Sequence, residues 1–185
     1  MAEDAGSLKH IFITGPPRCG KSTLIEKVVR RARRPMTGFF TREIRQAGKR
    51  VGFSINRLDG MAGVLAHENI KGRYRVGKYG VNIDDIDKMA VPSMIPSKPD
   101  ELVVIDEVGK MECLSSLFRA TLIQTLDSRN PVLASIALKG DNFLRGIKKR
   151  DDVLLISISE KNRDQMADHV LSFLAKGSSK NNLNI

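Results

Sequence analysis

The first stretch of the sequence able to do chemistry is Gly15-Pro16-Pro17-Arg18-Cys19-Gly20-Lys21-Ser22, which fits the Walker A pattern G-x-x-x-x-G-K-[ST]. In such a loop the backbone N–H groups bind phosphate oxygens, and glycines allow the close approach that this requires. The helix that follows directs its positive end at the same anion. We therefore predict a nucleotide-binding loop made of Gly15, Pro16, Pro17, Arg18, Cys19, Gly20, Lys21, Ser22 and Thr23.

Two residues of this loop have separate predicted tasks. Lys21 brings a cation to the β- and γ-phosphates, which makes it a predicted catalytic residue, and the Ser22 hydroxyl is a predicted ligand of Mg²⁺. A Gly-rich turn before an ordinary helix would fit the same pattern. An apolar strand before the loop and a helical pattern after it argue against that alternative.

A second chemical feature is the acidic end of an apolar run, Leu102-Val103-Val104-Ile105-Asp106-Glu107. Adjacent side chains diverge at the end of a strand, so the two carboxylates can serve different functions. We predict that Asp106 binds Mg²⁺ together with Ser22, and that Glu107 is catalytic and orients water toward the γ-phosphate. Without the phosphate loop, a strand that runs into an acidic surface turn would be the favoured interpretation.

Five further residues are secondary candidates for the site: Arg42, Lys139, Arg150, Asn162 and Arg163. Arg42 lies in an alternating segment that either lines the pocket or is purely structural. Lys139 follows a strand predicted to face the γ-phosphate, and Arg150 closes a basic stretch that is either an arginine-bearing lid or a solvated surface. Asn162 and Arg163 follow the last predicted strand, where a base could lie, although Asn162 is better placed to cap a helix with the glutamine three residues later.

Composition restricts the class of protein. The chain has 185 residues, 41% hydrophobic and 28% charged, and a mean hydropathy of −0.22, which is typical of one compact soluble domain. No apolar run approaches the roughly 18 residues needed to span a bilayer. We expect one domain over residues 1–176 and a disordered polar tail over residues 177–185.

The charge balance favours anionic partners. The net charge is +10 and the isoelectric point is about 9.9, which suits nucleotides or nucleic acids. Two cysteines are too few for a disulfide framework, and the acidic N-terminal residues lack the apolar segment of a secretion signal, so a cytoplasmic location is expected. The three histidines, His10, His67 and His169, are isolated in the sequence, and no special role is expected of them.

Hydrophobic periodicity predicts the elements that position these residues. Strands are expected at 11–14, 102–106, 132–138 and 153–158, helices at 24–32, 114–126 and 166–174, and a hairpin from residues 39–45 and 51–55. Residues 61–66 are a possible partner strand, 74–81 a loop or edge strand, and 84–87 a short helix. Pro92, Pro96 and Pro99 are expected to keep the chain extended before the strand at 102–106.

Strands that alternate with helices predict an α/β fold with a mostly parallel sheet flanked by helices and a β-hairpin insertion. An aspartate and a glutamate after an apolar strand, followed by another strand–helix unit, are similar to the RecA-like, additional-strand catalytic-glutamate division of P-loop NTPases. In that division strand 132–138 lies between the strands that carry the phosphate loop and Asp106. The guanine-reading N/T-K-x-D signature is missing, so guanine specificity is not predicted.

Several blocks resemble the small thermostable-type, or cancer-related, nucleoside-triphosphatases. They lie at residues 15–24, 38–45, 50–53, 75–81 and 104–112; the most specific are Gly-Phe-Phe-Thr-Arg-Glu at 38–43 and Val-Gly-Lys-Tyr-Gly-Val at 76–81. The resemblance implies Mg²⁺-dependent hydrolysis of ATP, GTP, CTP and UTP, with broad base tolerance and slow turnover, on a RecA-like core. Arg18 and Cys19 stand where the family usually has smaller residues, and Ser22 stands where threonine is common.

Two other functions stay open at this stage. A nucleoside or polynucleotide kinase would use the same phosphate loop with an acceptor in place of water. A nucleotide-switched module that binds nucleic acid would use the arginine run at 30–34, but those arginines also suit the end of a helix, so nucleic acid is not favoured. We expect a monomer with no membrane partner.

Overall fold

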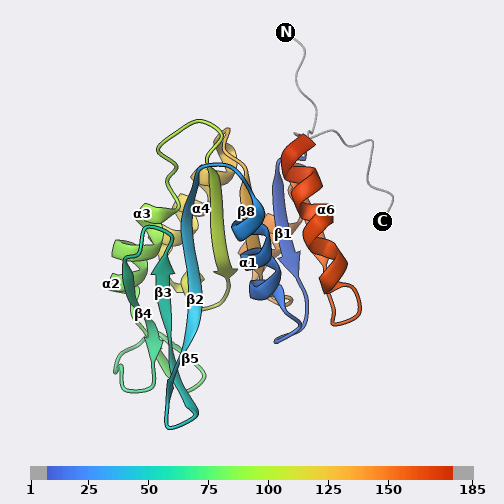
Figure 1. The fold of residues 1–185 in the computed structure, drawn as a ribbon. Coiled ribbons are helices and arrows are strands. Elements are labelled where there is room, and N and C mark those ends of the chain that lie inside the picture. Colours follow the sequence, from blue (N-terminus) through green and yellow to red (C-terminus); the bar gives the residue numbers. More distant parts are fainter. Residues whose placement is uncertain (1–7, 177–185) are drawn as a thin grey trace.

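The computed structural model describes residues 8–176, which form a nine-stranded sheet with helices packed against it (Figure 1). The strand order is β5-β6-β4-β3-β2-β7-β8-β1-β9. The strands are β1 (His10–Thr14), β2 (Met36–Gln46), β3 (Lys49–Arg57), β4 (Ala62–His67), β5 (Arg75–Val76), β6 (Tyr79–Val81), β7 (Leu102–Val108), β8 (Val132–Ile136) and β9 (Val153–Ser157).

The sheet has a parallel part and an antiparallel part. β2, β7, β8, β1 and β9 are parallel to one another, whereas β2, β3, β4, β6 and β5 pair in antiparallel fashion. β8 lies between β7 and β1, which confirms the predicted strand order. β2 and β3 form the predicted hairpin, and because β2 also pairs with β7, the hairpin is an extension of the main sheet.

The helices cover both faces of the sheet. They are α1 (Lys21–Arg31), α2 (Ile83–Asp85), the π-helix η1 (Ile86–Ala90), α3 (Val91–Ser93), the 3-10 helix η2 (Glu112–Leu114), α4 (Ser116–Asp127), α5 (Asn142–Lys148) and α6 (Arg163–Lys176). α1 and α6 pack on one face, and Arg31 of α1 pairs with Asp168 of α6 at 2.6 Å. The segment from α2 to α3, together with α4 and α5, covers the other face.

Alternation along β7 sends its side chains to these two layers in turn. Val103 and Ile105 pack toward α4, whereas Leu102 and Val104 pack toward α1 and α6. Asp106 follows Val104 by two residues and so lies on the same face as Leu102 and Val104, with its carboxylate on the α1 side of the sheet. Its position follows directly from the strand period.

One local prediction is wrong. Pro92 was expected to keep the chain extended, but it lies in the first turn of α3, at the end of a continuous helical segment that begins at Ile83. Proline is accommodated there because the segment changes from the π-helix η1 to α3 just before it, which interrupts the regular hydrogen bonds between residues four apart. The predicted disordered tail, 177–185, lies outside the described residues, and no helix within residues 8–176 has the length and apolar character to cross a bilayer.

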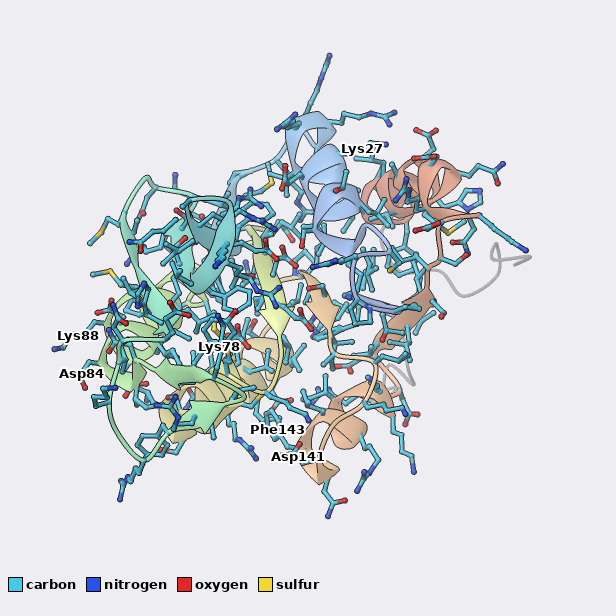
Figure 2. All side chains as sticks on the ribbon, turned by 90° about the horizontal axis from the view of Figure 1, so that it is seen from below. Lys27, Lys78, Asp84, Lys88, Asp141 and Phe143 are labelled. Carbon is cyan, nitrogen blue, oxygen red and sulfur yellow. The ribbon has the colours of Figure 1, made fainter. Side chains whose placement is uncertain are left out.

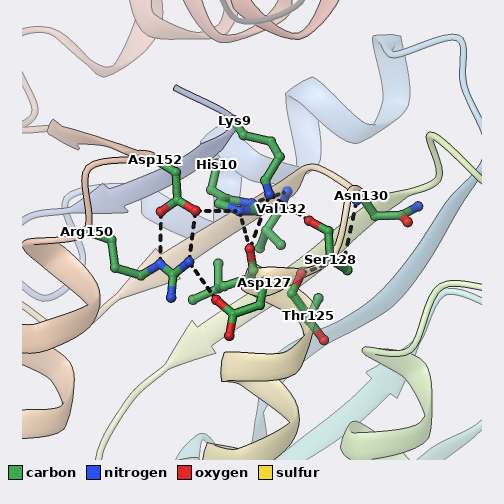
Figure 3. Close-up of polar contacts among 10 residues, drawn as sticks. Lys9, His10, Thr125, Asp127, Ser128, Asn130, Val132, Arg150 and Asp152 are labelled. Carbon is green, nitrogen blue, oxygen red and sulfur yellow. Dashed lines mark hydrogen bonds and ion pairs between the residues drawn. The ribbon is translucent and has the colours of Figure 1, made fainter. Parts of the chain in front are cut away.

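At the start of the parallel strands, His10 lies in a buried polar network (Figure 3). Its Nε2 lies 2.9 Å from the carbonyl oxygen of Leu126 and 3.6 Å from Asp152 Oδ2, and its Nδ1 accepts the N–H of Val132 at 3.2 Å. The expectation that His10 has no special role is therefore wrong. Its partners come from α4, β8 and the segment before β9, which are distant in sequence.

The opposite edge of the sheet, where the parallel strands end, carries the residues predicted to do chemistry. Figure 2 views the molecule from this side, with Lys27 of α1, Lys78 beside the hairpin and Asp141 before α5 around the centre of the view. Several outlying charges are paired with one another: Lys78 with Glu68 at 2.7 Å, and Lys27 with Asp164 at 3.3 Å.

Candidate active site

β1 and α1 hold the phosphate loop between them. β1 ends at Thr14 and α1 begins at Lys21, so the loop lies at the carboxyl edge of the sheet with the N-terminus of α1 behind it. Gly20 has a φ of 102°, a conformation that side chains rarely adopt, which explains the glycine at this point. Lys21 Nζ donates to the carbonyls of Gly15 and Pro16, each at 3.3 Å, so the ammonium lies over its own loop.

Asp106 is the buried carboxylate of the site. Its side chain is 1% exposed, Oδ1 accepts a hydrogen bond from the Ser135 hydroxyl, and Oδ2 has no hydrogen-bond partner within residues 8–176. Burial raises the pKa of Asp106, although the hydroxyls of Ser135 and Ser22 and the charges of Arg42 and Lys21 oppose that rise.

This environment fits a divalent cation. A buried carboxylate oxygen without a partner is costly unless a cation lies nearby. The Ser22 hydroxyl is close enough to lower the pKa of Asp106. A hydroxyl and a carboxylate are oxygen ligands of the kind that Mg²⁺ takes beside phosphate groups.

Glu107 is placed differently from its neighbour. It lines the cavity in front of the phosphate loop and is only partly buried. Burial raises its pKa, the charge of Lys21 opposes this, and the charge of Asp106 adds to it. Behind it, Glu112 is buried, and its Oε2 accepts the N–H of Gly109 at 3.1 Å.

The hairpin forms the wall opposite the phosphate loop. Arg42 Nη1 donates to Glu26 Oε1 at 2.6 Å, and its guanidinium lies 5.0 Å from the ring centroid of Phe40. Arg50 donates to Glu43 Oε1 at 2.8 Å and to the Tyr79 hydroxyl at 3.1 Å. Two arginines thus face the loop, each held by a carboxylate.

The loop, Glu107, the hairpin and the segment after β8 enclose a cavity of about 770 Å³. This volume is within the usual range for small-ligand sites. The cavity is lined by Gly15, Pro17, Arg18, Gly20, Lys21, Ser22, Thr23, Thr41, Arg42, Glu43, Arg50, Phe53, Glu107, Ala137, Leu138 and Lys139. Basic side chains outnumber carboxylates in this set, so the cavity attracts anions.

Most residues predicted for the loop lie in this cavity, and so do Arg42 and Lys139. Pro16 contributes its carbonyl to Lys21, and Cys19 is 4% exposed and packs in the core beneath the loop. Burial also removes the Cys19 thiol from the position of a direct phosphate contact.

Arg150 was predicted for the site, and this prediction is wrong. Its guanidinium donates to Asp152 at 2.9 Å and to Asp127 at 2.8 Å, in the network at the opposite edge of the sheet (Figure 3). The basic stretch before it forms α5, where Lys148 donates to the carbonyls of Ala137 and Leu138 at 2.6 and 2.9 Å. Lys148 therefore supports the segment that lines the cavity.

Asn162 and Arg163 lie outside the cavity lining. Asn162 Oδ1 accepts the N–H of Ser159 at 2.8 Å and its Nδ2 donates to the carbonyl of Ser157, so the side chain shapes the turn before α6. The predicted cap with Gln165 is not formed by this side chain. Arg163 packs over the phosphate loop, where a Cβ on Gly20 would lie 2.9 Å from its Cδ.

The roles of Arg50, Phe53 and Ser135 were not predicted from the sequence. Arg50 and Phe53 lie on the second hairpin strand, and the signals for them were the period of two that predicts the hairpin and the block at 50–53 that resembles the family. Ser135 lies on a buried strand, where a hydroxyl that faces Asp106 is visible only once β7 and β8 are paired.

The order of the strands, the phosphate loop after β1 and the acidic end of β7 define a P-loop NTPase fold. A family model described as NTPase matches residues 10–171. The chain belongs to this family of nucleoside-triphosphatases.

Relatives and solved structures agree with that assignment. The chain is 43% identical over 165 residues to nucleoside-triphosphatase THEP1 of Thermotoga sp. (strain RQ2), covering 89% of this chain and 94% of the relative. It is 35% identical over 181 residues to the cancer-related nucleoside-triphosphatase of Homo sapiens, covering 89% and 95%. The crystal structure of THEP1 from Aquifex aeolicus superposes with a TM-score of 0.82 at 30% identity, over 90% of this chain and 99% of that one.

Proposed function

We propose that this protein is a Mg²⁺-dependent enzyme that hydrolyses ATP, GTP, CTP and UTP to the diphosphate and phosphate, as a cytoplasmic monomer built from one domain. One observation carries the proposal: the phosphate loop and Glu107 line one basic cavity, and behind it lies an Asp106 oxygen, near Ser22, that has no hydrogen-bond partner among the described residues. The names of the relatives support the same activity.

The phosphate loop binds the substrate. Its backbone amides and the N-terminus of α1 attract the phosphate oxygens. Lys21, whose ammonium donates to the loop carbonyls, turns to the β- and γ-phosphates. The charged groups of the cavity suit phosphate and no particular base, which supports broad base tolerance.

Ser22 and Asp106 would hold Mg²⁺. When bound, Mg²⁺ neutralises charge on the phosphate oxygens and orients them. Ser135 fixes the orientation of the Asp106 carboxylate through its hydrogen bond to Oδ1. Oδ2 remains available as the ligand atom.

Glu107 orients and deprotonates the attacking water. Its partial burial and raised pKa make it a better proton acceptor than an exposed glutamate. Slow turnover is part of the proposal, and the resemblance of the sequence to the thermostable-type nucleoside-triphosphatases supports it.

Phosphate release tests the proposal. Wild-type protein with each of the four triphosphates should release phosphate with Mg²⁺ and not with EDTA. Glu107→Gln should bind Mg·ATP and lose nearly all activity, whereas Lys21→Ala should lose binding. Glu160→Gln, which changes an exposed glutamate after β9, is the matched control and should keep wild-type activity.

Two results would contradict the proposal. Full activity in Glu107→Gln would refute the role of that carboxylate. Transfer of the γ-phosphate to an added nucleoside or polynucleotide, in preference to water, would identify a kinase.

A further inference from the structure

The pairing of β2 with β7 determines where Arg42 lies. The two strands are parallel, and Phe40 is the register partner of Asp106. Side chains two residues apart on a strand share a face, so Arg42 lies on the same side as Phe40, roughly 7 Å further along the strand. Phe40 packs in the layer that contains α1. Arg42 therefore projects beyond Asp106 on the side where the phosphate loop and α1 lie.

The carboxylate that holds Arg42 belongs to α1 itself. Glu26 follows Ser22 by four residues, so the two side chains lie on one face of the helix, one turn apart. Arg42 Nη1 is 2.6 Å from Glu26 Oε1. Arg42 therefore pairs with α1 at a residue one helical turn beyond Ser22, and Arg42, Ser22 and Glu107 line the same cavity.

The Arg42–Glu26 ion pair is weak enough to exchange. The Arg42 side chain is 44% exposed and that of Glu26 is 26% exposed. Ion pairs at such exposure contribute about 0–1 kcal/mol. A phosphate group offers a guanidinium two charge-assisted hydrogen bonds, which is the stronger arrangement.

We propose that Arg42 is an arginine finger supplied by the protein's own hairpin: it leaves Glu26 and donates hydrogen bonds to the γ-phosphate oxygens in the transition state. This inference rests on the proposed function. The water oxygen forms its bond to the γ-phosphorus, the bond from that phosphorus to the β-phosphate oxygen breaks, and the water proton passes to Glu107. Arg42 forms and breaks no covalent bond; it stabilises the charge on the transferred group.

Three other basic groups are less suited to this role. Arg50 is held by both Glu43 and the Tyr79 hydroxyl, further along the hairpin from Asp106. Arg150 lies at the opposite edge of the sheet. Lys139 lines the cavity, but an ammonium lacks the planar fork that spans two phosphate oxygens.

The first test measures turnover and binding separately. Arg42→Ala should lower kcat by about 10³-fold or more while the Kd for Mg·ADP stays within threefold of wild type. The same variant should lose the tight complex of Mg·ADP with aluminium fluoride, which mimics the transferred phosphoryl group. Arg42→Lys should restore little of the kcat and little of the aluminium fluoride complex, because a lysine ammonium makes a single point contact.

Arg30→Ala is the matched control. Arg30 contacts the other oxygen of Glu26 at 3.5 Å, is 79% exposed and does not line the cavity. Its removal should leave kcat within twofold of wild type. If Arg42→Ala also keeps kcat within threefold and still forms the aluminium fluoride complex, Arg42 is not the finger.

Glu26→Gln tests whether Glu26 only holds the Arg42 guanidinium before Arg42 turns to the γ-phosphate. Because the neutral amide holds the guanidinium less strongly, this variant should have a kcat equal to or above that of wild type. A loss of kcat as large as in Arg42→Ala would overturn the role given to Glu26. Failure of the proposed function is distinguishable: wild-type protein would then release no phosphate, whereas active wild type with active Arg42→Ala refutes the finger alone.

Discussion

Replacement of His10 should change how the stability of the protein depends on pH. His10 is fully buried, and burial, helped by the charge of Lys9, lowers its pKa from 6.5 to about 4, while Asp152 partly opposes that shift. Nδ1 accepts the N–H of Val132, so Nε2 carries the proton and donates to the carbonyl of Leu126. A second proton on Nδ1 would break the bond to Val132 and leave a buried charge.

The lowered pKa of His10 makes the folded protein less stable in acid. The folded state binds the proton more weakly than the unfolded state, so the contribution is fully present above pH 6.5 and is lost as the pH falls toward 4. A difference of about 2.5 pKa units corresponds to about 3 kcal/mol of unfolding free energy. Most of this contribution of His10 to the unfolding free energy should be lost by about pH 4.5.

Urea denaturation at pH 7.5 and pH 4.5 measures the effect. His10→Gln removes the titrating group, so it should lose about 2–3 kcal/mol less on acidification than wild type does. His169→Gln, which changes an exposed histidine on α6, should behave as wild type. Equal losses in wild type and His10→Gln would refute the inference that buried His10 titrates on unfolding.

Two further substitutions test other parts of the structure. Gly38→Ala should destabilise the fold by more than about 3 kcal/mol in thermal unfolding. The φ of Gly38 is 122°, and the new Cβ would clash with the carbonyl oxygen of Val104. Gly146→Ala on α5 is the control: its Cβ would meet no described atom within 4 Å, so this variant should be neutral or slightly stabilising. Unchanged stability in Gly38→Ala would mean that the β2–β7 pairing is not as described. Burial raises the pKa of Glu112 to about 8, so the contribution of Glu112 to stability should fall as the pH rises from 4.5 through 8, by up to about 5 kcal/mol, opposite in sign to the contribution of His10. Glu112→Gln should therefore gain stability relative to wild type over that range, and a constant difference between the two proteins would contradict this.

Local patterns predicted the parts of the site that a few neighbouring residues determine. The phosphate loop needs glycines at set positions before a helix, and β7 shows its burial as a continuous apolar run that ends in Asp106. These signals require no knowledge of distant segments. They were sufficient for the loop and for the acidic strand end, whereas the order of β7, β8 and β1 was predicted from the similarity to the RecA-like division of P-loop NTPases.

Residues whose role depends on distant partners could not be predicted in this way. Arg150 followed a plausible basic stretch, but Asp127 and Asp152 hold it at the other edge of the sheet. His10 carried no local signal, because its partners come from three separate segments. Arg50 reaches the cavity only because the hairpin continues the sheet past the end of β7.

We propose that the loop at residues 15–23 binds the triphosphate, with Asp106 and Glu107 at its terminal phosphate. A crystal structure with Mg²⁺ and a nonhydrolysable ATP analogue tests this most directly. We expect the phosphates against the loop amides, Mg²⁺ between Ser22 and Asp106 Oδ2, and a water between Glu107 and the γ-phosphate. An analogue bound elsewhere, with the loop empty, would contradict it.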